Sequence, residues 1–478
     1  MHPLEYARRS TPAHQRVGAL VADASELGWA FSLMRDMPEA DVFLVGGSVR
    51  DAITGRRPHE WHTLVRDVTP ARLTRWLSAQ GRVERVNDGV WQFTPTNAPT
   101  CVEIALPRVR VPNADMRRAD FFADHKLRIE DDLASRDFSV NAMAYSLRDG
   151  RLTDPHGGLH DLTRYREIRP IRNAHDHFGQ EPNSLMRALR IAADVGLQIE
   201  KNTWHAIQAH GHRLNHVVHD SDGKATHAVP RHHLGREFLL GLRSNGSYFL
   251  KLVHDSGLLH HSVPELRQLT DIRHTDQESG WQKTEKLISV LESERHRKLY
   301  GIIIPSAALL VAALVYFFED ASQDQLRSLI SRLHLHRAKD ARLDFDHHHA
   351  FWLLEKAREL ETSNHDEMPL SRLERLLHGQ QGAELLALLH AAHIASGSHS
   401  VARERLNEMR TRRETLLTRF TMPKLLKGRD IVALGLTPGH HVRAILDKVR
   451  DAQLSGVLTS RRAALDFARY LVCHGDVC

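Results

Sequence analysis

The fold of this chain is decided by the stretch Leu44-Val45-Gly46-Gly47-Ser48-Val49-Arg50-Asp51. The apolar run Val42–Val45 has the character of a short strand, and two glycines follow it directly. Glycine allows the backbone to turn tightly at this point and to aim N–H groups at an incoming anion. We therefore expect Gly46, Gly47 and Ser48 to form a cradle for phosphate groups.

The overall composition is that of a globular protein with several domains. The chain has 478 residues, more than one hydrophobic core usually supports, so we expect two to four domains. Its formal net charge is +6, which suits a polyanionic partner, and 35 histidines add positive charge at mildly acidic pH. The 3 cysteines are too few for a disulfide framework, and no export signal is visible behind Met1–Ser10. These features favour a reducing compartment, and we predict a cytoplasmic protein.

The most apolar stretch of the chain is Ile302–Phe318. It contains Pro305 and Ser306 and falls short of a comfortable membrane span. We predict a helix that is buried in a protein core, and no membrane partner.

Strand-like segments lie in the first third of the chain, and helical segments make up the rest. The runs Asp41–Val45, Val90–Phe93 and Cys101–Leu106 have the alternating, β-branched character of strands. The spacing of Asn183–Val195 predicts an amphipathic helix with a basic face. Further helices are expected at Gln325–Leu333, Ala350–Glu361 and Ser371–His378, and linkers at Asp220–Lys224 and Thr362–Met368. This order predicts an α+β architecture, in which a head with a sheet precedes an all-α remainder.

Four sequence elements resemble the class II nucleotidyltransferases, the family of bacterial tRNA CCA-adding enzymes and poly(A) polymerases. The opening stretch, continued by Gly55-Arg56-Arg57-Pro58, is similar to the family pattern LVGGxVRDxLxGRxPxDxD. The other three elements are Asp132–Ala144, similar to DLxRRDFTINAMA, Asp154–Leu162, similar to DPxGGxxDL, and Pro423–Gly439, similar to PLLxGRDLxxLGLxPGP. The resemblance implies a polymerase-beta-like nucleotidyltransferase head, a mixed sheet with helices, followed by an all-α neck, body and tail. We place the head at residues 1–165, the neck at 166–245, the body at 246–410 and the tail at 411–478.

The same resemblance predicts a nucleotide site. In the family an arginine of the second element contacts the triphosphate, which corresponds to Arg136 here, and we expect Arg50 to hold phosphates with it. A charge-assisted arginine–phosphate contact explains this element better than a surface ion pair does. A DxxG loop, which begins at Asp154, couples head and neck in the family during nucleotide selection. The predicted nucleotide-binding residues are Gly46, Gly47, Ser48, Arg50, Arg136, Asp137, Asn141, Asp154, Gly157, Glu181, Arg187 and Arg190.

The catalytic pattern of the family is altered in this chain. Two aspartates bind the metal ions for nucleotidyl transfer in the family, and Glu60-Trp61-His62 stands in their place. Glu103, which corresponds to the family's third acidic residue, is intact. Mg²⁺ prefers oxygen ligands, whereas imidazole suits Mn²⁺ or Zn²⁺ better. If the protein is active, we expect Glu60, His62 and Glu103 to be catalytic and to bind Mg²⁺ or Mn²⁺. The alternative is that Glu60 and His62 are merely solvent-facing polar residues at a strand edge.

The base-reading motif of the family is altered as well. Its EDxxR pattern falls on Gln180–Ser184, so that Glu181 replaces the aspartate and Ser184 the arginine. Serine cannot present the planar fork of donors that arginine presents, and we expect the usual discrimination between C and A to be lost. The alternative is a local shift that brings Arg187 into the site.

The tail carries clustered basic residues. In the family, the tail and the body clasp tRNA through contacts with its backbone. Because phosphate neutralisation supplies sequence-independent affinity, we predict RNA binding by Arg412, Arg413, Lys424, Lys427 and Arg429. The alternative is a solvated helix face.

The sequence therefore predicts an RNA-binding member of this family, with nucleoside triphosphates and RNA, either tRNA or a tRNA-like 3′ end, as its partners. Two functions are compatible with these residues. The first is transfer of NMP from an NTP to an RNA 3′ hydroxyl, impaired by the altered motifs. The second is a catalytically inactive scaffold that binds RNA without turnover.

Overall fold

The computed structural model of the chain divides into two compact units. The first unit comprises Met1–Val263 together with Ala338–Arg342, and the second comprises Pro264–Arg337 and Leu343–Cys478. The structure describes residues 12–96, 101–111, 120–219, 225–271, 278–338, 340, 342–363, 368–397 and 400–473. The short segment 338–342 thus packs with the first unit although its neighbours in sequence belong to the second.

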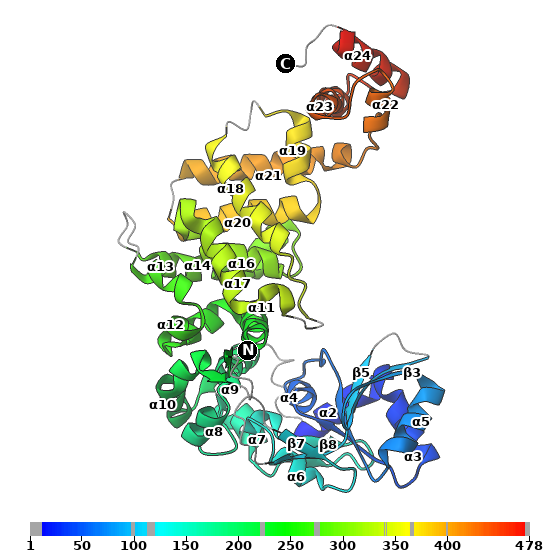
Figure 1. The fold of residues 1–478 in the computed structure, drawn as a ribbon, viewed down its shortest axis with the longest axis vertical. Coiled ribbons are helices and arrows are strands. Elements are labelled where there is room, and N and C mark those ends of the chain that lie inside the picture. Colours follow the sequence, from blue (N-terminus) through cyan, green and yellow to red (C-terminus); the bar gives the residue numbers. More distant parts are fainter. Residues whose placement is uncertain are drawn as a thin grey trace. The chain divides into compact units, whose positions relative to one another are not determined.

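A seven-stranded mixed sheet forms the centre of the head, in the order β3-β4-β5-β2-β1-β8-β9 (Figure 1). Its strands are β1 Asp41–Val45, β2 His62–Arg66, β3 Gly81–Asn87, β4 Val90–Pro95, β5 Val102–Ala105, β8 Ala144–Ser146 and β9 Leu152–Thr153. β2 and β5 are parallel, and the other neighbours are antiparallel. The strands predicted at Asp41–Val45, Val90–Phe93 and Cys101–Leu106 are confirmed as β1, β4 and β5.

The register of this sheet positions the predicted catalytic residues. Val42 and Leu44 of β1 are fully buried, which fixes this strand near the middle of the sheet. β2 pairs with β5 so that His62 lies opposite Glu103. Side chains that are paired across two strands point to the same face, so this pairing alone brings the imidazole and the carboxylate together. The helices of the head are α2 Ala13–Ala22, α3 Gly28–Asp36, α4 Gly47–Ile53, α5 Pro70–Gln80 and α6 Ile129–Leu133.

Three two-stranded ribbons lie outside the main sheet. They are β6 Arg108–Val111 with β7 Asp120–Ala123, β10 Glu167–Ile168 with β11 Gln198–Ile199, and β12 Val217–His219 with β13 Ala225–His227. β6 and β7 are antiparallel, and their register places Arg110 opposite Phe121. The linker predicted at Asp220–Lys224 lies outside the described residues.

The remainder of the first unit is helical. Its helices are α7 Gly158–His160, α8 Ala174–Gln180, α9 Asn183–Val195, α10 Lys201–His210, α11 Arg231–Asp255 and α12 Leu258–Ser262. The helix predicted at Asn183–Val195 is confirmed as α9, which packs against α11. α11 has non-helical backbone angles at Asn245, where the predicted neck ends, but the helix continues beyond that residue to Asp255.

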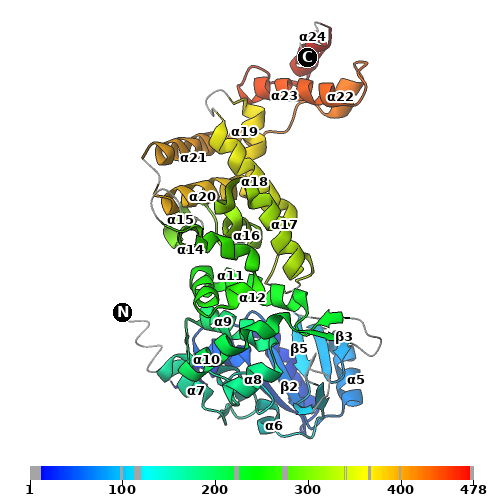
Figure 2. The same ribbon diagram turned by 60° about the vertical axis from the view of Figure 1, so that its left-hand side comes forward.

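The regular elements that the structure describes in the second unit are all helices. Its helices are α13 Gln268–Asp271, α14 Gly280–Glu292, α15 Glu294–Tyr300, α16 Ala307–Val315, α17 Ser322–Leu333, α18 His347–Thr362, α19 Leu370–Leu377, α20 Gly379–Ala395, α21 Ser400–Phe420, α22 Gly428–Val432, α23 His440–Leu454 and α24 Arg461–Cys473. Every residue of α16 is buried, as predicted for the apolar stretch. Among the described residues, none of the helices has the length and apolar character that crossing a bilayer requires. α22, α23 and α24 lie together (Figure 2) and share an apolar cluster that includes Ile431, Ile445 and Ala464.

The predicted α+β class is therefore confirmed: a head with a mixed sheet is followed by helices. The helices predicted at Gln325–Leu333 and Ala350–Glu361 lie within α17 and α18, and the one predicted at Ser371–His378 is α19, shifted by one residue. Thr362, the first residue of the second predicted linker, is the last residue of α18. Residues 364–367 of that linker are not described.

Candidate nucleotide site

A cavity of about 440 Å³ in the first unit gathers most of the predicted site residues. It is lined by residues of the head, by Glu181 directly after α8, by residues of α9 and α11, and by Asp340 and Arg342 of the inserted segment. The predicted residues on its wall are Gly46, Gly47, Ser48, Arg50, Glu60, His62, Glu103, Arg136, Asp137, Asn141, Glu181, Arg187 and Arg190. Of the predicted head and neck residues, Asp154 and Gly157 are not on this wall.

The glycine turn holds Arg136 at the floor of the cavity. Gly46 has a φ of 67°, and a Cβ at this position would lie 2.7 Å from Nη1 of Arg136. Arg136 donates from Nε and Nη2 to Oδ2 of Asp132, over 2.9 and 2.8 Å. The Asp132 side chain is only 2% exposed, whereas that of Arg136 is 22% exposed. Asp132 thus fixes the guanidinium from behind and leaves Nη1 beside the glycine turn, which suits a phosphate-binding role.

The hydroxyl of Ser48 is engaged within the protein. Its hydroxyl donates to the carbonyl of Glu60 over 3.0 Å and accepts from the backbone N–H of His62 over 2.8 Å. The residue is 1% exposed. Ser48 therefore ties the start of α4 to Glu60 and to His62, the first residue of β2, and its part in a phosphate cradle stays a prediction.

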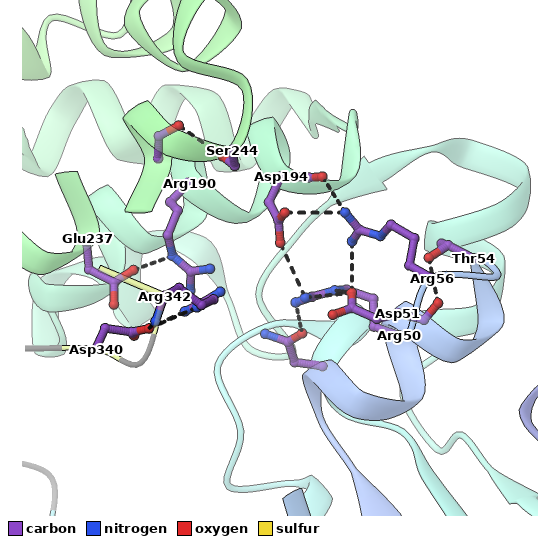
Figure 3. A network of polar contacts seen from close by, with 12 residues as sticks. Arg50, Asp51, Thr54, Arg56, Arg190, Asp194, Glu237, Ser244, Asp340 and Arg342 are labelled. Atoms are coloured by element: carbon purple, nitrogen blue, oxygen red, sulfur yellow. Dashed lines mark hydrogen bonds and ion pairs between the residues drawn. The ribbon is translucent and has the colours of Figure 1, made fainter. Parts of the chain in front are cut away.

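Arg50 is bound to protein partners and also lies on the wall of the cavity (Figure 3). Nη1 donates to Asn141 over 2.8 Å, Nε donates to Asp51 over 2.9 Å, and Nη2 lies 3.6 Å from Asp194. Arg56 extends the network, because it donates to Asp51 over 2.8 Å and to the carbonyl of Asp194 over 2.7 Å. With a side chain only 7% exposed, Arg50 joins α4 to α9, and its contact with phosphate stays a prediction.

The structure brings Glu60, His62 and Glu103 together. Nδ1 of His62 lies 3.2 Å from Oε1 of Glu103, and Nε2 lies 3.7 Å from Oε2 of Glu60. The hydrogen bond from His62 lowers the pKa of Glu103. The three side chains are 37% to 45% exposed, so they line a cavity and are not isolated on a strand edge.

This arrangement does not fit a metal ion. A histidine that binds a metal ion must offer the lone pair of a ring nitrogen to it. Here each ring nitrogen of His62 faces a carboxylate. The ring itself occupies the space between the two carboxylates, where shared metal ligands would have to converge. Across the described ranges, no group of three or more His, Cys, Asp or Glu side chains is placed to hold a metal. The predicted residues are therefore neighbours, but their geometry is not that of a Mg²⁺ or Mn²⁺ site.

The predicted basic face of α9 points inward. Arg187 forms an ion pair of 2.7 Å with Asp137, whose charge raises the pKa of Arg187. Arg190 donates to Glu237 of α11 over 2.5 Å, and both side chains are less than a tenth exposed (Figure 3). Burial opposes the ionisation of Glu237, but Arg190 and Arg187 outweigh it and lower the pKa of Glu237 to about 2. These arginines join α9 to the head and to α11.

Glu181 and Ser184, at the positions of the base-reading motif, are both engaged in contacts within the protein. The Glu181 carboxylate lies 2.6 Å from Arg110 of β6 and also pairs with Arg172. Ser184, which is 4% exposed, donates its hydroxyl to the carbonyl of Glu181. Glu181 thus already has two cationic partners, and the loss of discrimination between C and A stays a prediction.

Several residues on the cavity wall were not predicted from the sequence. Arg108 lies over the ring of Phe121, with 4.5 Å from its guanidinium carbon to the ring centroid. Arg110, Arg236, Asp340 and Arg342 also line the cavity. The alternation Arg108-Val109-Arg110 directly after the Glu103 strand is a signal that could have indicated the first two. Nothing local marks Arg342, which lies far along the chain.

Asp154 and Gly157 serve the local backbone. The two carboxylate oxygens of Asp154 accept from the N–H groups of Gly158 and Leu159, over 2.7 and 2.9 Å. Gly157 has a φ of 71°, which favours glycine. This loop therefore starts α7, and its coupling of head and neck stays a prediction.

The predicted RNA-binding residues divide into two kinds. Arg413 of α21 is half-buried, and it donates to the carbonyls of Leu377 and Gly379 over 2.8 and 2.9 Å. It therefore satisfies the end of α19, a structural role that the sequence did not predict. Arg412 is partly exposed on the same helix, and Lys424, Lys427 and Arg429 are exposed at and before the start of α22.

Comparison with known proteins agrees with this fold. The profile of the poly A polymerase head domain matches residues 42–169. The multifunctional CCA protein of Acinetobacter baumannii strain SDF is 30% identical over 233 residues, which are 48% of this chain and 51% of the relative. The chain thus matches about half the length of this curated relative.

The solved structures show the same fold over nearly the whole chain. The apo form II of a CCA-adding enzyme has a TM-score of 0.59 at 17% identity, covering 96% of this chain and 98% of the other. The CCA-adding enzyme of Bacillus stearothermophilus in complex with CTP has a TM-score of 0.56 at 17% identity, with 98% and 100% covered.

Proposed function

We propose that this chain, whose residues 42–169 are a head domain of the class II nucleotidyltransferase family, binds nucleoside triphosphates and an RNA 3′ end but transfers nucleotides very slowly or not at all in Mg²⁺. One observation carries this proposal: the ring of His62 lies between Glu60 and Glu103, in contact distance of both. The family resemblance and the CCA-adding relatives support the choice of ligands.

The cavity supports nucleotide binding because guanidinium groups face its interior. In the pair Arg136–Asp132 the arginine is 22% and the aspartate 2% exposed. In the pair Arg342–Asp340 the corresponding values are 32% and 9%. The carboxylates lie behind the arginines, which leaves N–H donors for phosphate oxygens.

Transfer is impaired because the reacting hydroxyl lacks its activating group. In this family divalent metal ions activate the attacking hydroxyl and neutralise the leaving pyrophosphate. The residues present do not fit such an ion, so this chain's own contribution is limited to holding phosphates. Arg136 holds them beside Gly46, and the hydroxyl must lose its proton without metal assistance.

A second candidate is slow transfer with Mn²⁺. It is favoured by the fact that Glu60, Glu103 and His62 share one wall, since Mn²⁺ accepts imidazole better than Mg²⁺ does. It requires the His62 ring to leave Glu103. The test is incubation with a tRNA lacking its terminal CCA, labelled CTP and ATP, and each metal in turn. Robust addition in Mg²⁺ by the unsubstituted chain contradicts the main proposal.

We predict that the four nucleoside triphosphates bind with similar affinity. Glu181 is engaged by Arg110 and Arg172, and Ser184 offers no donor fork, so contacts to the triphosphate dominate. A lost bidentate base contact forfeits about 1–3 kcal/mol, and the dissociation constants of ATP, CTP, GTP and UTP should agree within about tenfold. Calorimetry that finds one of them a hundredfold tighter, by about 2.8 kcal/mol, shows that another set of side chains reads the base.

We predict that tRNA binding falls steeply with salt. If the tail neutralises several phosphates, the dissociation constant should rise about 10³-fold between about 50 and 200 mM salt. Replacing Lys424, Lys427 and Arg429 together by Ala should flatten this dependence, measured by a gel-shift or fluorescence titration. As a matched control, Arg35, Arg75 and Arg82, exposed in the head, are replaced by Ala and should leave the slope unchanged. A flat dependence in the unsubstituted chain rules out the RNA partner.

A further inference from the structure

We propose that the cavity binds the triphosphate of a nucleotide without a divalent metal ion, and that Arg342 is one of the residues that hold it. This inference rests on the proposed nucleotide binding and adds its charge chemistry and a specific residue. It follows from the observation that Glu60, His62 and Glu103 are not arranged to bind a metal ion.

The space for a metal is taken by a side chain of the protein. His62 starts β2 and is paired in register with Glu103 on β5, so its position is fixed by the sheet itself. Ser48 binds both the backbone N–H of His62 and the carbonyl of Glu60, which holds the two residues on either side of Trp61. Trp61 is 2% exposed and anchors this turn in the core. Displacing the ring would therefore disturb a fixed strand end.

Arg342 reaches the cavity from a remote part of the sequence. The segment 338–342 packs with the first unit, and it places both Asp340 and Arg342 on the cavity wall (Figure 3). Nε and Nη2 of Arg342 donate to the two oxygens of Asp340 over 3.0 and 3.2 Å. Arg243 of α11 donates to the carbonyl of Arg342 and fixes the backbone there.

The surroundings of Arg342 keep it charged and place it near the altered carboxylates. Burial opposes its charge, but Asp340, Asp194 and Glu60 outweigh burial and raise the pKa of Arg342. Arg342 and Glu60 line the same cavity, and Glu60 stands where the family pattern places a metal ligand. A fixed guanidinium at this position can donate hydrogen bonds to phosphate oxygens and neutralise part of their charge. Neutralisation of phosphate charge is otherwise a function of the metal ion.

The first test compares ATP binding to the full chain with and without divalent metal. Calorimetry is run in EDTA and in Mg²⁺. We expect the two dissociation constants to agree within about threefold. Binding that needs Mg²⁺ by more than about tenfold overturns this inference but leaves the proposed nucleotide binding intact. The absence of ATP binding in both conditions overturns the proposed function itself.

The second test uses two variants with opposite expected effects. Arg342→Ala should weaken ATP binding in EDTA about tenfold, because a charge-assisted donor is lost. Asp340→Asn removes the carboxylate that competes for Arg342 and should strengthen ATP binding a few-fold, while the backbone is unchanged. A loss of affinity in both variants, or no change in either, contradicts the assignment of Arg342.

Control measurements separate binding from folding. Arg337→Ala removes the same charge from an exposed position five residues earlier and should leave ATP binding unchanged. Adenosine should bind equally to Arg342→Ala and to the unsubstituted chain, because it has no phosphate. If adenosine binding falls together with ATP binding, Arg342 supports the structure of the cavity and does not contact the triphosphate.

Discussion

The double variant Glu60→Asp/His62→Asp is expected to add nucleotides to an RNA 3′ end in Mg²⁺ at least about a hundredfold faster than the unsubstituted chain. The change removes the imidazole from between the carboxylates and supplies two short oxygen ligands opposite Glu103. Hard carboxylate ligands are the ones that Mg²⁺ prefers. The measurement is incorporation of labelled nucleotide into a tRNA that lacks its terminal CCA. The identity of the added base is not part of this prediction, because the base-reading residues are unchanged.

Two further variants make this result specific. Glu60→Asp alone keeps the His62 ring in place and should gain little activity. Glu103→Gln in the double variant should abolish the gain, since it removes the third ligand. If the double variant is folded and binds ATP but is as inactive as the unsubstituted chain, the defect lies elsewhere in the cavity.

The second large effect concerns the buried pair of Arg190 and Glu237. Glu237→Gln leaves the guanidinium of Arg190 buried with a neutral partner, and we expect the first unit to lose about 3–5 kcal/mol of stability at neutral pH. Hydrogen exchange of the amides in α9 and α11 reports the free energy of opening for this region. Arg190→Met/Glu237→Leu, which removes both charges, should cost far less than Glu237→Gln. Equal losses in both variants mean that packing, not the unpaired charge, explains the effect.

The same pair predicts a specific acid sensitivity. The pKa of Glu237 is lowered from 4.5 to about 2 in the folded protein. A carboxyl with a lowered pKa contributes stability that is fully present above its unfolded value and is lost as the pH falls through the folded value. We therefore expect the free energy of opening of α9 and α11 to decline between about pH 4.5 and pH 2. This part of the decline should be absent in the Arg190→Met/Glu237→Leu variant.

The local sequence pattern was sufficient to predict strands that bury one face and helices that bury one stripe of their surface. The strand-like run Asp41–Val45 became β1, and the spacing of Asn183–Val195 gave α9 with the predicted ends. The glycine turn was predicted correctly because its φ of 67° at Gly46 is a property that few other residues tolerate. The buried helix within Ile302–Phe318 was predicted because its apolar run was too short for a bilayer and too long for a surface.

The partners of charged side chains could not be predicted in the same way. Arg50, Arg190 and Arg413 all carry the charge that suits phosphate, and the sequence offers no means of telling a free guanidinium from one bound to protein. The structure binds Arg50 to Asn141 and Asp51, Arg190 to Glu237, and Arg413 to two carbonyls. Except for Asp51, these partners are far apart in sequence, and only the packing of helices and strands decides which of them meet.

By itself, then, the sequence determined the strands of the head, the glycine turn, the long helical remainder and the presence of Glu60 and His62 where the pattern it resembles has two aspartates. These are properties of single residues and of periodic patterns, which act over a few residues of chain. Only the tertiary structure decided that His62 lies between Glu60 and Glu103 and that Arg110 forms an ion pair with Glu181. It also decided that Arg342 lines the cavity. The physical reason is that charged side chains interact according to their distance in space. The register of two strands, or a segment from a remote part of the chain, sets that distance, and neither produces a recognisable local pattern in the sequence.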